Sequence, residues 1–149
     1  MVSNYIKIQD QLIQHYQQAK QNKNTFEFIQ YRNHTWTPEY ISLKNKYSRD
    51  FKHNEPFLNG QPSAPLFTIY ENLIYIGLDL KNGLLEDDEV RQQSALEAAK
   101  KDRELALSIQ QQLKLSLLIS KTGSSFPLSL SNHSLFVGRL SLCRGFWLS

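Results

Sequence analysis

The side chains that most often perform catalysis or bind metals are few and widely spaced in this chain. Its only cysteine is Cys143, so no pair of thiols is available for a disulfide or a thiolate metal site. The histidines do not recur at the i, i+4 spacing that places two imidazoles on one helix face; they are His15, His34, His53 and His133. No Gly-x-Ser-x-Gly elbow and no glycine-rich phosphate loop occurs. These patterns predict no catalytic residue, no metal site and no cofactor.

One acid-x-lysine pattern has the residue types for hydrolysis. Asp79 and Lys81 end a stretch of two β-rich runs, residues 66–70 and 73–80. In metal-dependent nucleases, such a pair binds a divalent cation and activates water. The arrangement resembles the core of the restriction-endonuclease-like nucleases, although Leu66 stands where that family places its first metal-binding aspartate. The resemblance implies a degenerate or incomplete metal-dependent nuclease with Asp79 and Lys81 as its remnants.

A second pattern, Asp-Arg-Glu-Leu-Ala-Leu-Ser-Ile-Gln, covers residues 102–110. Its alanine would let a helix approach a shallow apolar patch closely, and its acidic residues would complement basic ground around that patch. The stretch resembles the inverted ubiquitin-interacting motif, a single helix of the form Asp-x-Glu-Leu-Ala-x-x-Leu-Gln. The resemblance implies weak, non-catalytic ubiquitin recognition by these residues: Asp102, Glu104, Leu105, Ala106, Ile109 and Gln110. A core or coiled-coil helix is the alternative interpretation of the same stretch.

The elements that precede these residues indicate a small α+β body. Residues 3–20 repeat apolar side chains at three- and four-residue steps, which predicts an amphipathic helix with Gln9 among the glutamines of its wet side. Residues 25–31 are rich in β-formers and predict a short strand. Thr37 can cap a following helix, with proline in its first turn, so a second helix is expected at 38–50.

Residues 66–80 predict a β-hairpin that turns at Glu71-Asn72. Period-two alternation would place six apolar side chains on one face: Phe67, Ile69, Ile74, Ile76, Leu78 and Leu80. The predicted fold class is therefore α+β, with a small antiparallel hairpin or sheet and two short helices. One long helix and a poorly ordered C-terminal tail follow it.

Residues 86–118 predict the long helix, because they contain no proline or glycine and open with four acidic residues that suit a helix N-terminus. A stripe at three- and four-residue steps runs along one side, small at its start and apolar at its end. Its members are Ala95, Ala99, Asp102, Ala106, Ile109, Leu113 and Leu117. Such a helix would be about 50 Å long. Part of it must therefore project, bend or pair with another surface.

Charge divides the chain after Ser120. All 14 acidic residues precede Lys121, so the net charge of +3 and the pI near 9.0 come from Lys121, Arg139 and Arg144. An acid-free tail is thus the source of the basic pI, which leaves no strong nucleic-acid signal. We expect a body at residues 1–80, a long charged helix at 81–120 and a Ser/Leu-rich tail at 121–149. The tail is an ordered hairpin, a disordered extension or the product of a different reading frame or exon.

These patterns together predict a non-enzymatic protein-interaction module. Its long helix would bind another protein, either ubiquitin or a second copy of the chain, and the degenerate nuclease is the alternative. The N-terminal residues lack the apolar run of a signal peptide. No stretch approaches the ~20 apolar residues of a membrane span. We therefore expect a cytoplasmic or nuclear location.

Overall fold

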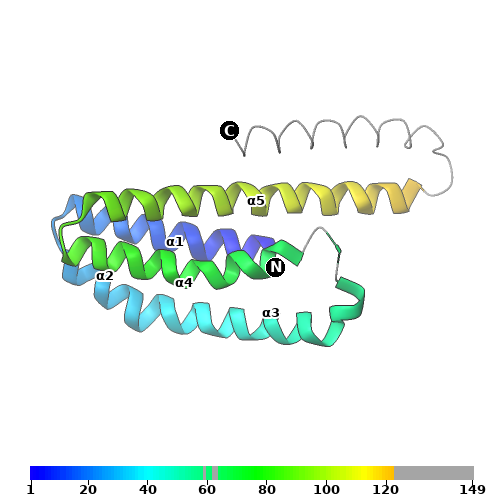
Figure 1. The fold of residues 1–149 in the computed structure, drawn as a ribbon, viewed down its shortest axis with the longest axis horizontal. Coiled ribbons are helices and arrows are strands. Elements are labelled where there is room, and N and C mark those ends of the chain that lie inside the picture. The colour runs from blue at the N-terminus through cyan, green and yellow to red at the C-terminus, as the bar shows by residue number, and fades with distance from the viewer. Residues whose placement is uncertain (59, 62–63, 123–149) are drawn as a thin grey trace. The chain divides into compact units, whose positions relative to one another are not determined.

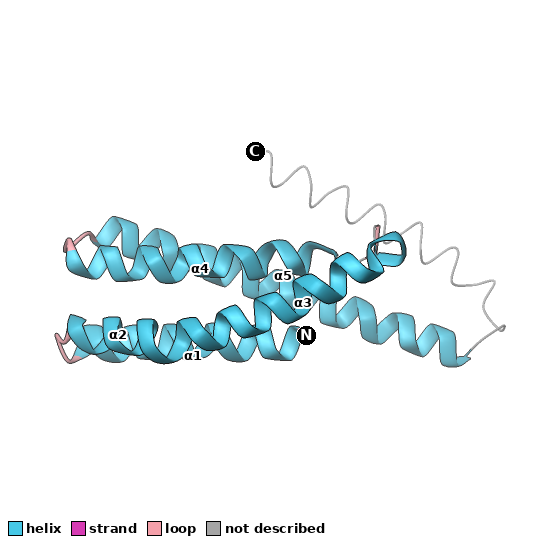
Figure 2. Cartoon of the chain, turned by 90° about the horizontal axis from the view of Figure 1, so that it is seen from below, coloured by secondary structure: helices cyan, strands magenta, loops and turns pink. Residues whose placement is uncertain are grey.

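The computed structural model describes residues 1–58, 60–61 and 64–122, and every regular element in that part of the chain is a helix (Figures 1 and 2). In chain order they are α1 (Val2–Gln21), α2 (Thr25–Tyr31), the π-helical segment η1 (Arg32–Trp36), α3 (Thr37–Leu58), α4 (Ala64–Leu85) and α5 (Glu89–Thr122). Because α2, η1 and α3 follow one another without a break, the fold is an all-α arrangement of four helical rods. The predicted α+β fold class is wrong.

By compactness the chain divides into two units, Met1–Leu113 and Lys114–Ser149. In the first unit the rods alternate in direction, and short turns such as Asn22–Asn24 and Glu86–Asp88 join them (Figure 1). The described part of the second unit is the C-terminal portion of α5. None of the described helices combines the length and the apolar character needed to cross a membrane.

The predicted hairpin at residues 66–80 is instead the middle of α4. The buried residues of this helix follow steps of three and four, not two; they are Leu66, Ile69, Tyr70, Leu73, Ile76, Gly77, Leu80 and Gly83. Nearly every position between 66 and 80 is apolar or aromatic, so the sequence satisfies both periods. Short apolar runs do not separate a strand from a buried helix. Burial against the other rods decides for the helix.

The strand predicted at residues 25–31 is also wrong, because this segment is α2. Asn24 begins it as an N-cap, and its side-chain Oδ1 accepts a hydrogen bond from the Glu27 backbone N–H at 3.2 Å. Asparagine is among the strongest N-cap residues, so the cap satisfies a donor that the first turn leaves unpaired. Capping thus overrides the β-preference of Phe26 and Ile29.

Large aromatic side chains from α1, α2, η1, α3 and α4 fill the core. The largest fully buried side chains include Trp36, Tyr5, Tyr16, Tyr40, Tyr70 and Phe28. Most of their polar atoms have partners: Trp36 Nε1 donates to the Ile8 carbonyl at 2.9 Å, and Tyr70 Oη donates to the Met1 carbonyl at 3.0 Å. A buried ring of this size contributes 150–250 Å² of contact area. These side chains hold the first three rods together.

The π-helical segment keeps one face of the second rod turned towards the core. Four of its buried residues recur at unbroken steps of four: Phe28, Arg32, Trp36 and Tyr40. An α-helix needs a three-residue step among the fours to hold one face inward. The wider turn of η1 replaces that step, and Trp36 stacks on Tyr40 with ring centroids 5.1 Å apart.

The predicted stripe of α5 packs against α1 and α4 along much of its length. Ala95, Ala99, Ala106 and Ile109 are buried, which confirms that part of the stripe. Leu113 and Leu117, at the apolar end of the stripe, are 39% and 62% exposed and do not belong to the core. We call the surface of α1 and α4 on which α5 packs the seat of α5. In it α5 buries three alanines, Gln92 and Ile109, so it has mostly smaller side chains than the aromatic core.

Candidate functional site

Helix α5 carries all six residues that the sequence proposes for binding, and it divides them between two sides. Ala106 and Ile109 are buried, and Asp102 is half-buried on the same inner side. Glu104 and Leu105 are exposed, and Gln110 is half-buried. The motif therefore exposes Glu104 and Leu105 to solvent, whereas Ala106 at its centre is buried inside the bundle.

Asp102 lies in a groove of about 290 Å³ between α4 and α5, which Asn72, Tyr75 and Asp79 also line. Burial raises the pKa of the Asp102 carboxyl. Its negative charge also adds to burial in raising the pKa of Tyr5, whose buried hydroxyl has no hydrogen-bond partner among the described residues. The carboxylate of Asp102 on α5 and the hydroxyl of Tyr5 on α1 are thus two groups whose charged forms are both disfavoured.

Asp79 and Lys81 lie on α4, where no hairpin forms. Asp79 accepts a hydrogen bond from Arg91 Nε at 3.0 Å, and Arg91 also pairs with Glu86. Among the described residues, no group of three or more potential metal-ligating side chains gathers. The described part of the chain contains no β-hairpin of the kind on which the resemblance to nucleases depends. Asp79 instead binds Arg91 and so links the start of α5 to α4.

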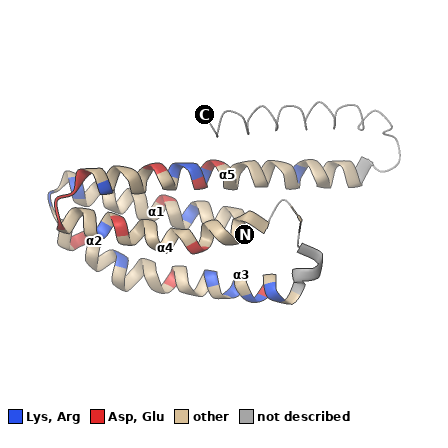
Figure 3. Cartoon of the chain, viewed as in Figure 1, with Lys and Arg blue, Asp and Glu red and all other residues tan. Residues whose placement is uncertain are grey.

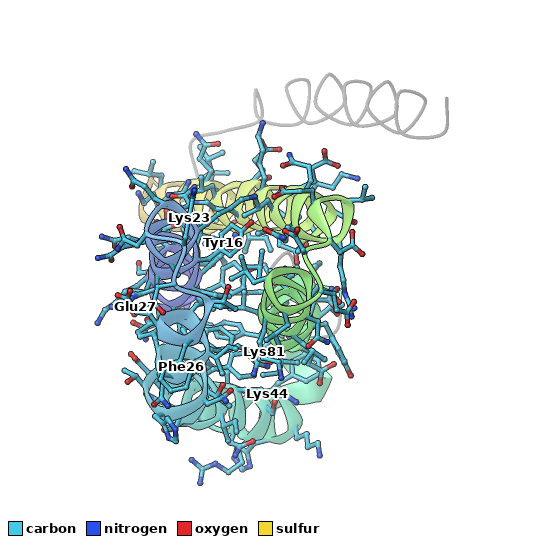
Figure 4. All side chains as sticks on the ribbon, turned by 90° about the vertical axis from the view of Figure 1, so that its left-hand side faces the viewer. Tyr16, Lys23, Phe26, Glu27, Lys44 and Lys81 are labelled. Carbon is cyan, nitrogen blue, oxygen red and sulfur yellow. The ribbon has the colours of Figure 1, made fainter. Side chains whose placement is uncertain are left out.

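Two consecutive hydrogen bonds through Gln92, which we call the polar relay, hold the first half of α5 on the bundle. Tyr16 Oη donates to Gln92 Oε1 at 2.6 Å, and Gln92 Nε2 donates to the Gly83 carbonyl at 2.9 Å. Figure 4 looks along the helices from the end with the α4–α5 turn, and Tyr16 lies between α1 and α5 there. Gln92 is 2% exposed, so the relay satisfies a buried amide that would otherwise be costly.

Gln9 adds another buried amide to this seat. The sequence predicts it on the wet side of its helix, but it is 2% exposed and its Nε2 donates to the Ala99 carbonyl. Its Oε1 has no partner among the described residues. Gln9 also lines a groove of about 430 Å³ between α1 and α5, beside the ion pair of Asp10 and Arg103. Gln9 stands four residues after Tyr5 and three before Leu12, so its position fits the buried face, and its polar residue type led to the wrong prediction.

Arg32 is a further buried polar residue that the sequence does not single out. Its guanidinium is 8% exposed and lies against Gly77 of α4, where a Cβ would stand 3.3 Å from Nε. Nη1 donates to Asn33 Oδ1 at 3.1 Å, and Nε has no partner among the described residues. Burial lowers the pKa of this arginine. In the sequence, Arg32 stands four residues after Phe28 and four before Trp36, and this spacing is the signal that could have indicated its burial.

The C-terminal portion of α5 has a different surface from its first half. Charged residues of both signs alternate up to Glu104, after which Lys114 is the one charged residue before Lys121 (Figure 3). We define the apolar segment as Leu115, Leu117, Leu118 and Ile119, whose exposed fractions lie between 54% and 62%. The four residues lie within five consecutive positions.

The chain matches no protein-family model, no curated protein and no solved structure.

Proposed function

We propose that the chain is a non-enzymatic interaction module that binds a partner protein along α5. The observation that carries the proposal is the apolar segment, in which Leu115 and Leu117 are 54% and 62% exposed. Exposed apolar side chains that cluster in this way mark interaction surfaces more often than scattered ones do.

The energetics of the apolar segment favour a helix-binding groove as its partner. Full burial of a leucine side chain is worth about 1.5–3 kcal/mol. Because Leu115 and Leu117 are 54% and 62% exposed, burial of their exposed parts would together contribute roughly 1.7–3.5 kcal/mol before the cost of association. The surrounding segment is apolar on several sides of the helix, which suits a groove better than a flat surface. We therefore propose a partner with an apolar groove that accepts one helix.

Ubiquitin binding by residues 102–110 stays a prediction. Glu104 and Leu105 are exposed, but Ala106 and Ile109 are 0% and 2% exposed. The motif would need both of these to touch ubiquitin, so binding requires α5 to turn or to leave its seat. This requirement separates the ubiquitin proposal from the apolar-segment proposal.

Replacement of Leu115 and Leu117 by glutamine tests the apolar segment, because glutamine keeps helix propensity and removes the apolar contact. Val90→Gln is the matched control, since Val90 is 81% exposed on the same helix. Proteins that co-purify with the full chain from its source cells would be identified, and the candidate partner would be purified. We expect the double variant to weaken its affinity at least about tenfold, and Val90→Gln to leave it unchanged. A partner that binds all three proteins equally would contradict the proposal.

Titration of the ¹⁵N-labelled chain with purified ubiquitin tests the second partner. Binding through the motif predicts shifts of the Leu105, Ala106 and Ile109 amides that grow when Asp10→Ala removes the Asp10–Arg103 pair. Unchanged spectra at millimolar ubiquitin in both proteins would exclude ubiquitin and leave the apolar-segment proposal untouched.

A further inference from the structure

The seat of α5 differs from the rest of the core in what fills it. Between Glu89 and Ile109 the buried side chains of α5 are Gln92, three alanines (Ala95, Ala99 and Ala106) and Ile109, whereas α1 contributes Tyr5, Ile8, Leu12 and Tyr16. Alanine buries little apolar area, so much of the attachment comes from polar contacts. Three buried polar atoms on α1 are left without partners among the described residues, and two of them are Gln9 Oε1 and Tyr5 Oη. Each unpartnered group reduces the stability of this seam.

The turn that returns α5 onto the bundle contains one residue in a disfavoured conformation, although Asp88 caps α5 by accepting a hydrogen bond from the Arg91 backbone N–H at 3.0 Å. Only Glu86, Asp87 and Asp88 separate α4 from α5, and Asp87 adopts φ of +53°. L-residues disfavour this left-handed region, although aspartate tolerates it better than most. Residues 84–122 contain no proline or glycine, and the sequence alone indicates a helix from residue 86. The sequence of this stretch is therefore compatible with a second conformation, in which α4 and α5 form one continuous straight helix instead of turning at Glu86–Asp88.

We propose that two copies of the chain exchange α5. When the turn at Glu86–Asp88 straightens, each α5 leaves its own seat and occupies the same seat on the second copy. A second copy is the occupant that fits, because its α5 carries the same alanines, the same Gln92 and the same Arg103. Every contact of the closed monomer is then remade between copies, so the equilibrium depends on the turn and on protein concentration.

The exchange goes beyond the binding of a partner by the apolar segment and uses other residues. It depends on Asp87 and on the seat between Glu89 and Ile109, whereas the proposed function depends on Leu115 and Leu117. The double variant Leu115→Gln/Leu117→Gln should lose its partner protein and keep the exchange. Failure of one proposal can therefore be told from failure of the other.

Variants of Asp87 test the turn. Glycine adopts positive φ without penalty, so Asp87→Gly should shift the chain towards monomer. Valine is a poor residue at positive φ, so Asp87→Val should lower the dimer dissociation constant by roughly tenfold for each of the two turns. Leu85→Val is the control, because Leu85 is 57% exposed beside the turn and lacks the positive φ. Light scattering after size exclusion at about 0.1–1 mM chain, the range of intramolecular effective concentrations, measures the masses. Equal dimer fractions for the glycine and valine variants would overturn the proposal.

A charge exchange tests the route without dependence on the turn. Asp10 and Arg103 form a two-point pair at 3.0 and 3.2 Å across the seat. Asp10→Arg places two arginines there, and Arg103→Asp places two aspartates there. In a mixture of these two variants, exchange gives a heterodimer in which both seats hold opposite charges. Native mass spectrometry with one ¹⁵N-labelled variant should show heterodimer well above the statistical half of all dimers. Dimers at the statistical ratio, or no heterodimer, would show that α5 stays in its own chain.

Discussion

At the scale of single residues, Gly83 on α4 and Asp102 on α5 are two positions where a substitution should change the stability of the bundle. A Cβ added at Gly83 would stand 2.6 Å from Gln92 Cγ and 3.2 Å from the Asp88 carbonyl oxygen. Gln92 has little freedom to retreat, because its amide is bonded to both Tyr16 and the Gly83 carbonyl. Glycine is therefore required here by close approach, although Gly83 has no positive φ.

Gly83→Ala should lower the free energy of unfolding by about 1–2 kcal/mol. Overpacking costs about 1–3 kcal/mol, and alanine returns up to about 1 kcal/mol of helix propensity. Gly77→Ala is the matched control on the same helix, because its nearest contact would be 3.3 Å, at the Arg32 side chain. Urea denaturation of the two variants measures the difference. A Gly83 variant as stable as the native chain would show that Gln92 moves freely.

Asp102→Asn should stabilise the protein at neutral pH, because burial raises the pKa of the native carboxyl. The raised pKa means that the folded state favours the protonated form. Its advantage is present below the unfolded pKa of about 3.9 and is lost as pH rises through the folded pKa. The asparagine variant cannot ionise, so its stability relative to the native chain should grow over that window and level off above it. Thermal unfolding at pH 3 and pH 7 measures this difference. A difference that does not change with pH would contradict the role given to burial.

At the scale of the elements, α1 and α5 contribute side chains of different size to the contact between them, which we call the α1–α5 seam. α1 buries tyrosines, a leucine and isoleucine, whereas α5 buries mainly alanines. The side chains that bind α5 to α1 and α4 are largely polar, and the ion pairs Lys20–Glu89 and Asp10–Arg103 are partly exposed. Exposed ion pairs contribute about 0–1 kcal/mol each.

Hydrogen exchange should show that α5 opens before the rest of the bundle. We expect the backbone amides of residues 95–106 to exchange with a lower opening free energy than those of α1 residues 8–16, because less apolar surface is lost when α5 leaves. Native-state exchange at low denaturant, read by NMR, measures both sets. Equal opening free energies would show one cooperative unit instead.

At the scale of the whole molecule, sequence periodicity predicts some helices well and misassigns others. It predicts α1, the start of α3, and α5 with the alanine part of its stripe, since these segments separate apolar from polar faces. It fails for α4, where apolar residues occupy both faces and the period is ambiguous. The candidate site shows the same division: the sequence locates the motif on α5, but only packing reveals that Ala106 and Ile109 face inward. The tail beyond Thr122, including the alternative hairpin, lies outside the described residues.

The single wide turn at η1 gives the second rod one residue more than an ordinary α-helix would use there. Each residue of an α-helix advances the side chains by about 100° around the axis. Deletion of the exposed Thr35 would restore the three-residue step that an α-helix needs before Trp36. The rod would then continue as an ordinary α-helix with Tyr40 still on the core side. Deletion of Thr35 should therefore cost little stability, whereas deletion of the exposed Ser42, after the wide turn, would rotate Tyr47 by about 100° away from the core that it now helps to fill.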